Sequence, residues 1–285
     1  MEKRKVELVV LSDIHLGTYG CHAKELVQYL KSIDPKILIL NGDIIDIWQF
    51  RKRYFPMNHL KVLKEILKVA SRGNKVYYIT GNHDEFLRKF TDLELDHFSL
   101  LNKLVLDLNG EKAWFFHGDV FDASIHSAKF LAKLGGWGYD LLIVINRFTN
   151  WILEKLGREK YSLSKRIKQS VKKAISFISD FEETAIELAI SNSFDYVVCG
   201  HIHHAQIREI DRNGKKCTYL NSGDWVESLS SLEWHENKWS LYSHTASFLM
   251  EEEEEEDDSM KDLEKLASFI NPFIKSEILS NIETT

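Results

Sequence analysis

Five short polar motifs occur along the chain, and each directly follows a run of apolar residues rich in β-branched or aromatic side chains. Such runs predict buried strands. In open α/β sheets, sites form at the carboxyl ends of the strands, so polar motifs in these places predict one common site on an α/β fold. The motifs are Asp13-Ile14-His15, Gly42-Asp43, Gly81-Asn82-His83-Asp84, His117-Gly118-Asp119 and Gly200-His201-Ile202-His203.

The residue types in these motifs are those of a metal centre. A mixture of imidazole, carboxylate and amide oxygen suits manganese, iron or zinc better than calcium. Two such ions about 3.5–4 Å apart can clamp a phosphoryl group and activate water for in-line attack. One motif alone would be an ordinary turn, but five at strand ends together predict a site for two divalent metal ions. The expected ligands are Asp13, His15, Asp43, Asn82, His117, His201 and His203.

The motif series resembles that of the calcineurin-like metallophosphoesterase superfamily, from Val6 to about Tyr242. The resemblance implies a β-sandwich flanked by helices, with both metals at one edge and Asp43 between them. It also implies that His83 contacts the phosphate or protonates the leaving group, and that Asp84 orients His83. By the same resemblance, Asp13, His15 and His203 hold one metal, and Asn82, His117 and His201 hold the other.

Two further carboxylates stand close to the motifs. Asp46 follows Asp43 by three residues, and Asp119 closes the motif of His117. We expect each of them to orient a ligand histidine, because carboxylates around metal sites commonly accept the second ring N–H of a metal-binding imidazole.

The chain divides into three parts. Residues 6–117 alternate strand and helix patterns, which is typical of βα units. Residues 121–190 carry long amphipathic helical patterns, and residues 195–242 return to short strands that predict an antiparallel meander. We therefore expect a metallophosphoesterase domain at 1–245, with a helical cap inserted at 121–190, and a separate acidic tail at 246–285. The periodicity predicts helices at Ala23–Ser32, Asn58–Ser71, Leu141–Leu156 and Leu163–Ala189.

The helical insertion separates His117 from His201, two proposed ligands of one metal, so its ends must lie at the rim of the site. We expect it to cover the metals as a cap. It combines an apolar stretch at 141–152 with a basic one at 155–173. That combination suits an amphiphile with an anionic head, or a membrane surface. Packing of the apolar stripe on the main domain would explain the same residues.

The size of the insertion, its basic rim and the chain length are similar to those of the UDP-2,3-diacylglucosamine hydrolases of lipid A synthesis. This resemblance implies hydrolysis of the diphosphate of UDP-2,3-diacylglucosamine to UMP and 2,3-diacylglucosamine 1-phosphate. It also implies two Mn²⁺ ions as cofactor and a cap that accommodates the acyl chains. Much of that family carries Gly-Asn-Arg-Asp where this chain has His83, which is the form of the broader superfamily. The residues expected to contact phosphate or uridine are Arg88, Arg147, Lys165 and Arg166.

Other functions remain open on the sequence. A phosphodiesterase or nucleotide phosphohydrolase of different specificity would use the same ligands, and a metal-binding scaffold would keep them without catalysis. A protein Ser/Thr phosphatase is disfavoured because Thr80 stands where that branch has arginine. A nuclease needs a broad basic surface. Here the formal net charge is −6, and the eight acidic residues at 251–258 account for more than all of it, so the remainder of the chain carries only a slight positive charge. We therefore expect no nucleic-acid partner.

Composition predicts a cytoplasmic protein. The three cysteines are odd in number, lack metal-ligand spacing and read as reduced thiols. Neither an apolar leader nor a membrane-spanning stretch is expected. The composition of the cap also allows peripheral contact with the cytoplasmic face of the membrane. The acidic run at 251–258 repels itself and cannot be buried, so we expect the tail to be separate from the fold.

Overall fold

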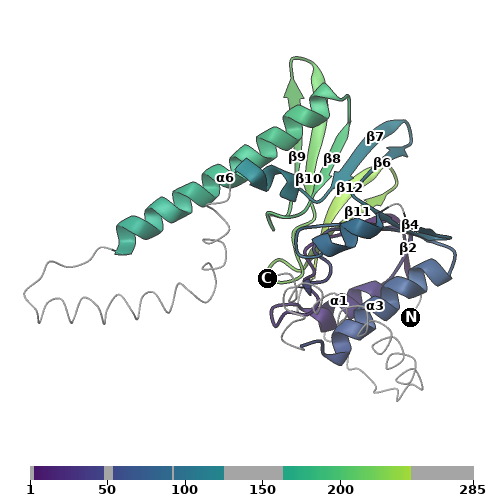
Figure 1. Ribbon diagram of the computed structural model, residues 1–285. Coiled ribbons are helices and arrows are strands. Elements are labelled where there is room, and N and C mark those ends of the chain that lie inside the picture. Colours follow the sequence, from purple (N-terminus) through teal and green to yellow (C-terminus); the bar gives the residue numbers. More distant parts are fainter. Residues whose placement is uncertain (1–2, 48–53, 92, 125–162, 245–285) are drawn as a thin grey trace, which may run out of the picture.

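The computed structural model describes residues 3–47, 54–91, 93–124 and 163–244, of which 122–124 and 163–175 are described by their backbone alone. These residues form two β-sheets that pack face to face, with helices on the outer faces of both (Figure 1). The predicted sandwich flanked by helices is confirmed.

The first sheet consists, in spatial order, of β12 (Lys238–Ser243), β11 (Ser230–His235), β1 (Arg4–Leu11), β2 (Ile33–Asn41), β3 (Lys75–Ile79), β5 (Phe98–Leu101) and β4 (Leu93–Leu95). Its centre is parallel, because β1 pairs with β2, β2 with β3 and β3 with β5 in the same direction. Its outer strands β11, β12 and β4 pair antiparallel. The parallel centre brings the carboxyl ends of β1, β2 and β3 to one edge.

The second sheet consists, in spatial order, of β6 (Lys103–Leu108), β7 (Glu111–Phe116), β8 (Tyr196–Cys199), β10 (Lys215–Asn221) and β9 (Gln206–Arg212). Strands β7, β8 and β10 are parallel neighbours. The predicted antiparallel meander over residues 195–242 is therefore wrong. The chain forms the β9–β10 hairpin, returns β10 beside β8, and then crosses to the first sheet for β11 and β12.

The two sheets meet in an apolar layer that includes Val10 and Ile39 from the first sheet and Phe115, Val198 and Leu220 from the second. Each of these side chains is at most 1% exposed. Burial of an aliphatic or aromatic side chain of this kind contributes about 1.5–3 kcal/mol. This layer holds the edges of the two sheets at a fixed separation.

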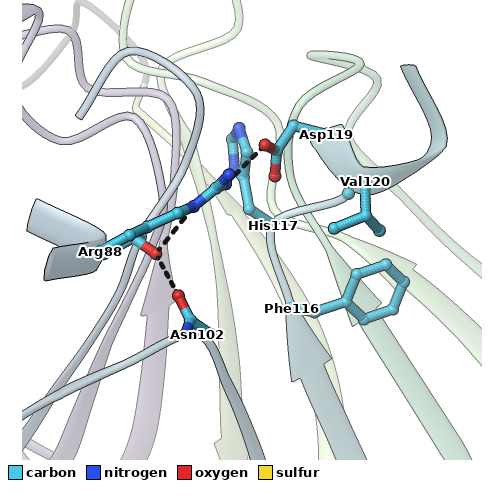
Figure 2. A pocket seen from close by; sticks show the side chains of 8 residues that line it. Arg88, Asn102, Phe116, His117, Asp119 and Val120 are labelled. Carbon is cyan, nitrogen blue, oxygen red and sulfur yellow. Dashed lines mark hydrogen bonds and ion pairs between the residues drawn. The ribbon is translucent and has the colours of Figure 1, made fainter. Parts of the chain in front are cut away.

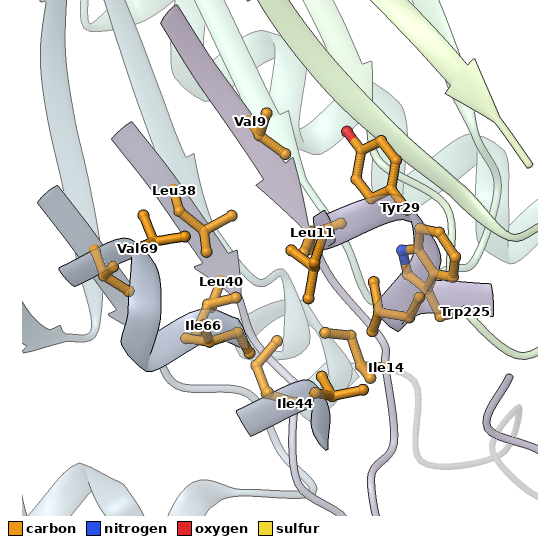
Figure 3. Packing of buried hydrophobic residues seen from close by; sticks show 14 of the residues in the cluster. Val9, Leu11, Ile14, Tyr29, Leu38, Leu40, Ile44, Ile66, Val69 and Trp225 are labelled. Carbon is orange, nitrogen blue, oxygen red and sulfur yellow. The ribbon is translucent and has the colours of Figure 1, made fainter. Parts of the chain in front are cut away.

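The other face of the first sheet is covered by α1 (Ala23–Ser32) and α3 (Met57–Ser71). Successive residues of β1 alternate between the two faces: Leu8 faces the second sheet, whereas Val9 and Leu11 pack against the helices. Figure 3 shows this packing, with Tyr29 of α1 and Ile66 of α3 directed at the strands.

The outer face of the second sheet is covered by the carboxyl half of α6 (Leu163–Ser191) through Phe181, Ala185, Ile186 and Ala189. Its amino half extends beyond the sandwich (Figure 1). The helices predicted at 23–32, 58–71 and 163–189 are confirmed within two residues at each end, and the one at 141–156 lies outside the described residues. No helix in the described ranges is long and apolar enough to cross a membrane.

Candidate metal centre

The five motifs follow β1, β2, β3, β7 and β8, as expected, and their side chains converge at one edge of the sandwich. Within the described residues, three sets of side chains each offer ligand atoms that lie within 4.8 Å of one another. The sets share members and therefore form one continuous centre. They are Asp13, His15 and His203; His15, Asp43 and His83; and Asp43, His117 and His201.

The backbone at this edge is bent in a way that few residues tolerate. Asp13, His15, Asp43, His201 and His203 all have positive φ, between 52° and 68°. Such angles are uncommon outside glycine, although Asp and His are enriched among the exceptions, and they cluster at functional sites. The turns after β1 and β2 stabilise each other, because the amide of Asp13 donates to Gly42 O at 3.0 Å and that of His15 to Asp43 O at 2.9 Å.

The turn after β2 requires glycine at position 42. Its φ is 85°, and a Cβ at this position would collide with the imidazole of His117. The turn after β2 can therefore approach the ligand on β7 only because residue 42 has no side chain.

In both Asp13 and Asp43, one carboxylate oxygen contacts the backbone and the other faces a histidine side chain. One oxygen of each accepts a backbone N–H: Asp13 Oδ2 from His201 at 3.0 Å and Asp43 Oδ1 from His83 at 2.7 Å. The other oxygen faces an imidazole, with Asp13 Oδ1 lying 3.1 Å from His203 Nε2 and Asp43 Oδ2 lying 3.3 Å from His117 Nε2. Each carboxylate is thereby fixed by the backbone and keeps one oxygen for the centre.

Among the residues that the structure describes, four buried atoms of the centre have no hydrogen-bond partner: Asp13 Oδ1, His15 Nε2, Asn82 Oδ1 and His117 Nε2. A buried polar atom without a partner costs about 1–3 kcal/mol. All four belong to the predicted ligand set, and a divalent cation would satisfy them. The donor set of imidazole, carboxylate and amide oxygen fits manganese, iron or zinc.

One ligand histidine, His117, is oriented by a hydrogen bond on the far side of its ring, and a carboxylate lies near the far side of another, His203. His117 Nδ1 lies 2.9 Å from Asn41 O, and a carbonyl can only accept, so Nδ1 carries a proton and Nε2 is the nitrogen that would bind a metal ion after losing its own proton. His203 Nδ1 lies 3.8 Å from Asp224 Oδ2. Sequence reasoning missed Asp224, although its position just after β10, at the same edge, was a usable signal.

His83 and Asp84 differ from the prediction in their contacts. The Nδ1 of His83 lies 3.0 Å from Asp46 Oδ2. Asp84 instead accepts from the amide of Gly81 at 2.6 Å, the amide of Ile44 at 2.9 Å and the hydroxyl of Tyr78 at 2.6 Å. The prediction that Asp84 orients His83 is wrong. The carboxylate of Asp84 instead stabilises the turns after β2 and β3 by accepting from the amides of Ile44 and Gly81.

Arg88 lies beside the centre but is bound to protein atoms. Its Nη2 donates to Asp119 Oδ2 at 2.5 Å. Arg88, Asp119 and His117 all line a cavity of about 210 Å³ (Figure 2). Asp119 was predicted to orient a histidine, and its carboxylate binds Arg88 instead. Arg147 lies outside the described residues, and Lys165 and Arg166 lie in the first turns of α6, where only the backbone is described.

The centre concentrates negative charge in a buried place. Burial raises the pKa of Asp13, but the positive charge of His203 outweighs it and lowers that pKa to about 2. Burial also raises the pKa of Asp43, yet His117 lowers it well below its usual value. Burial lowers the pKa of His117, whereas Asp43 raises it to about 10. His15 differs, since burial lowers its pKa to about 4. The two carboxylates therefore attract cations, protons or metals.

Several proteins are similar to this chain. It is 26% identical over 241 residues to a UDP-2,3-diacylglucosamine hydrolase of Aliivibrio fischeri, and the alignment covers 82% of this chain and 97% of that protein. It is 25% identical over 238 residues to a UDP-2,3-diacylglucosamine hydrolase of Blochmanniella pennsylvanica, covering 81% and 93%. Among solved structures, an archaeal phosphodiesterase matches with a TM-score of 0.39 at 11% identity, over 83% of this chain and 98% of that one.

A family model described as calcineurin-like phosphoesterase matches residues 6–205. This range contains all of the predicted ligands and both sets of carboxylate–imidazole contacts. The chain belongs to the calcineurin-like phosphoesterase family and is a metal-dependent hydrolase of phosphoric esters or anhydrides.

Proposed function

We propose that this protein hydrolyses the diphosphate of UDP-2,3-diacylglucosamine and releases UMP and 2,3-diacylglucosamine 1-phosphate. The support for this substrate is the similarity to UDP-2,3-diacylglucosamine hydrolases, which extends over almost the whole length of those relatives. The support for the chemistry is one observation: a buried carboxylate, Asp43, belongs to two of the three ligand sets.

The proposed cofactor is a pair of divalent ions, with Mn²⁺ the first choice. Asp13, His15 and His203 would hold one ion, Asn82, His117 and His201 would hold the other, and Asp43 would lie between them. Bound ions would polarise the phosphoryl oxygens and activate water for attack. The protein supplies rigid placement, since the carboxylates of Asp13 and Asp43 are fixed by backbone amides.

His83 is proposed to hydrogen-bond the phosphoryl oxygens of the substrate. Its side chain is 29% exposed, whereas that of His117 is 1% exposed, so a substrate can reach His83 directly. Its Nδ1 is held by Asp46, and its Nε2 lies 3.9 Å from Asp43 Oδ2 and faces the centre. An N–H placed where negative charge develops stabilises the transition state of phosphoryl transfer.

The insertion at 121–190 is proposed to bind the lipid part of the substrate, with contacts from Arg147, Lys165 and Arg166. Its carboxyl end lies beside the metal ligands, because the ring of Phe181 lies 6.1 Å from that of His201. A cytoplasmic location with peripheral contact to the membrane, and the lack of a nucleic-acid partner, belong to the same proposal.

The test is hydrolysis of UDP-2,3-diacylglucosamine by the full chain with Mn²⁺, with bis(p-nitrophenyl) phosphate as a second substrate. Asp43→Asn should abolish turnover of both. Asp34→Asn is the matched control, because Asp34 lies at the other end of β2 and pairs with Arg72. Release of UMP supports the proposal. Turnover of only the small diester would reject the lipid substrate and favour a phosphodiesterase of another specificity.

A further inference from the structure

We propose that the ion pair of Arg88 and Asp119 is a positioning bridge that sets the distance between two ligands of one metal, Asn82 and His117. The inference rests on the proposed two-metal site. Arg88 lies in the short helix η1 (Glu85–Phe90), six residues after Asn82, and Asp119 begins η2 (Asp119–Ser124), two residues after His117. The bridge therefore spans the two turns that carry these ligands.

The contacts of Arg88 reach both turns. Its Nη2 donates to Asp119 Oδ2 at 2.5 Å and to Gly81 O at 3.4 Å, and its Nε lies 3.4 Å from Thr80 Oγ1. Thr80 and Gly81 directly precede Asn82. Thr80 Oγ1 in turn donates to Asn102 Oδ1 at 3.0 Å, so the polar chain continues to the end of β5 (Figure 2).

Arg88 is placed to hold protein atoms together rather than to receive a substrate anion. Its charge is neutralised by a carboxylate that is only 9% exposed, and its guanidinium is also directed at two acceptors of the Asn82 turn. Charge-assisted hydrogen bonds in a partly buried position are stronger and more directional than exposed ones. A planar guanidinium can serve several acceptors at once, whereas an ammonium is a single point charge.

The other proposed ion has different support. The turns that carry its ligands Asp13 and His15 are joined to Gly42 and Asp43 by backbone hydrogen bonds. The turn of His203 is joined to Asp13 Oδ2 through the amide of His201. Loss of the Arg88–Asp119 bridge should therefore weaken one ion selectively and leave the ion at Asp13, His15 and His203 in place.

The experiment is titration of the metal-free protein with Mn²⁺ by calorimetry, and with Co²⁺ by visible absorption, in Arg88→Met, Asp119→Asn and the double variant. We expect each single variant to bind one of two ions about 10- to 100-fold more weakly, as is typical when the support of a metal ligand is removed. The double variant should be about as weak as the single ones, because the two residues act as one unit.

Two further variants separate positioning from folding. Arg88→Lys should recover part of the affinity, because it keeps the charge opposite Asp119 but not the contacts to Thr80 and Gly81. Arg72→Met removes a similar ion pair, with Asp34 at 3.2 Å, remote from the centre, and should leave both metal affinities unchanged.

Unchanged binding of both ions in Arg88→Met and Asp119→Asn would overturn the inference. So would a raised KM for substrate in Arg88→Met alone with normal metal binding, which would assign Arg88 to the substrate. A fall in the Tm of the metal-free variants that exceeds that of Arg72→Met, with equal loss of both ions, would reduce the bridge to a general structural role. Binding of fewer than two ions by the unaltered protein would reject the two-metal site itself.

Discussion

The Nδ1 of His83 lies 3.0 Å from the carboxylate of Asp46, although Asp84 is its neighbour in the chain. Asp46 comes from the turn after β2 and His83 from the turn after β3, so the contact forms between two strand ends. The orientation of the His83 imidazole, which is proposed to contact the substrate, thus depends on how β2 and β3 pair.

Asp46→Asn should lower kcat about 10- to 100-fold with a smaller change in KM. The amide keeps the shape of the side chain but removes the charge that holds His83 with Nε2 towards the centre. Steady-state kinetics with bis(p-nitrophenyl) phosphate measures this. An equal loss in the double variant Asp46→Asn/His83→Gln and in His83→Gln would show that Asp46 acts through His83, whereas additive losses would contradict it.

Asp84→Ala should mainly destabilise the fold. It leaves the amides of Ile44 and Gly81 and the hydroxyl of Tyr78 without their acceptor. Each buried donor without a partner costs about 1–3 kcal/mol, so urea unfolding should show a loss of several kcal/mol. Tyr78→Phe removes a donor and leaves the carboxylate with two amides, and should lose less. Equal stability of Asp84→Ala and the unaltered protein would refute this account.

Gly42→Ala should prevent metal binding. The added Cβ collides with His117 at a residue whose φ is 85°. Gly214→Ala is the matched control, because Gly214 has a φ of 80° but nothing within 4 Å of the added Cβ. The control should lose only about 1 kcal/mol for the backbone conformation. Comparable metal affinity in both variants would show that the contact with His117 is unimportant.

Metal binding should release protons at neutral pH. In the metal-free protein the pKa of His117 is raised to about 10 and that of His203 to about 9, because the effect of nearby carboxylates exceeds that of burial. Both rings must lose a proton to bind a metal, so about two protons should be released per protein. Calorimetry in two buffers of different ionisation enthalpy measures this number. An observed enthalpy that is independent of the buffer would exclude it.

The stability of the metal-free protein should fall as pH rises from about 6.5 to 10. His117 binds its proton more tightly in the folded protein, where its pKa is about 10, than in the unfolded chain, where it is about 6.5. Its stabilising contribution is therefore fully present below pH 6.5 and is lost as pH approaches 10. Urea unfolding at several pH values tests this, and His117→Asn should reduce the slope. A stability that rises over this range would contradict the assignment.

Much of the fold could be predicted because its signals are local. The strands that end at Leu11, Asn41, Ile79, Phe116 and Cys199 each contain an uninterrupted apolar run, and each is followed within a few residues by a motif residue. Helices α1, α3 and α6 were predicted from the period of their apolar residues. A strand that is buried on both faces, or a helix with one apolar face, can be recognised from the pattern of apolar residues in its own segment.

The pairing of the later strands could not be predicted in this way. β10 pairs with β9, its hairpin partner, and also runs parallel to β8, which precedes it by a whole strand. β11 and β12 are short strands joined by a turn, as β9 and β10 are, yet they belong to the other sheet. Short strands have no local feature that specifies which sheet edge they join, and the packing of the sheets makes that choice.

The sequence by itself determined the family and the chemistry and predicted a set of metal ligands, because such residues follow strand ends and their types are set by what divalent metals bind. Only the tertiary structure decided which carboxylate lies beside which partner: Asp46 beside His83, Asp224 beside His203, and Asp119 beside Arg88. Each of these pairs joins turns from different strands. Neighbours along the chain point in different directions at a strand end, so proximity in sequence does not specify contact, whereas the register of the sheets does.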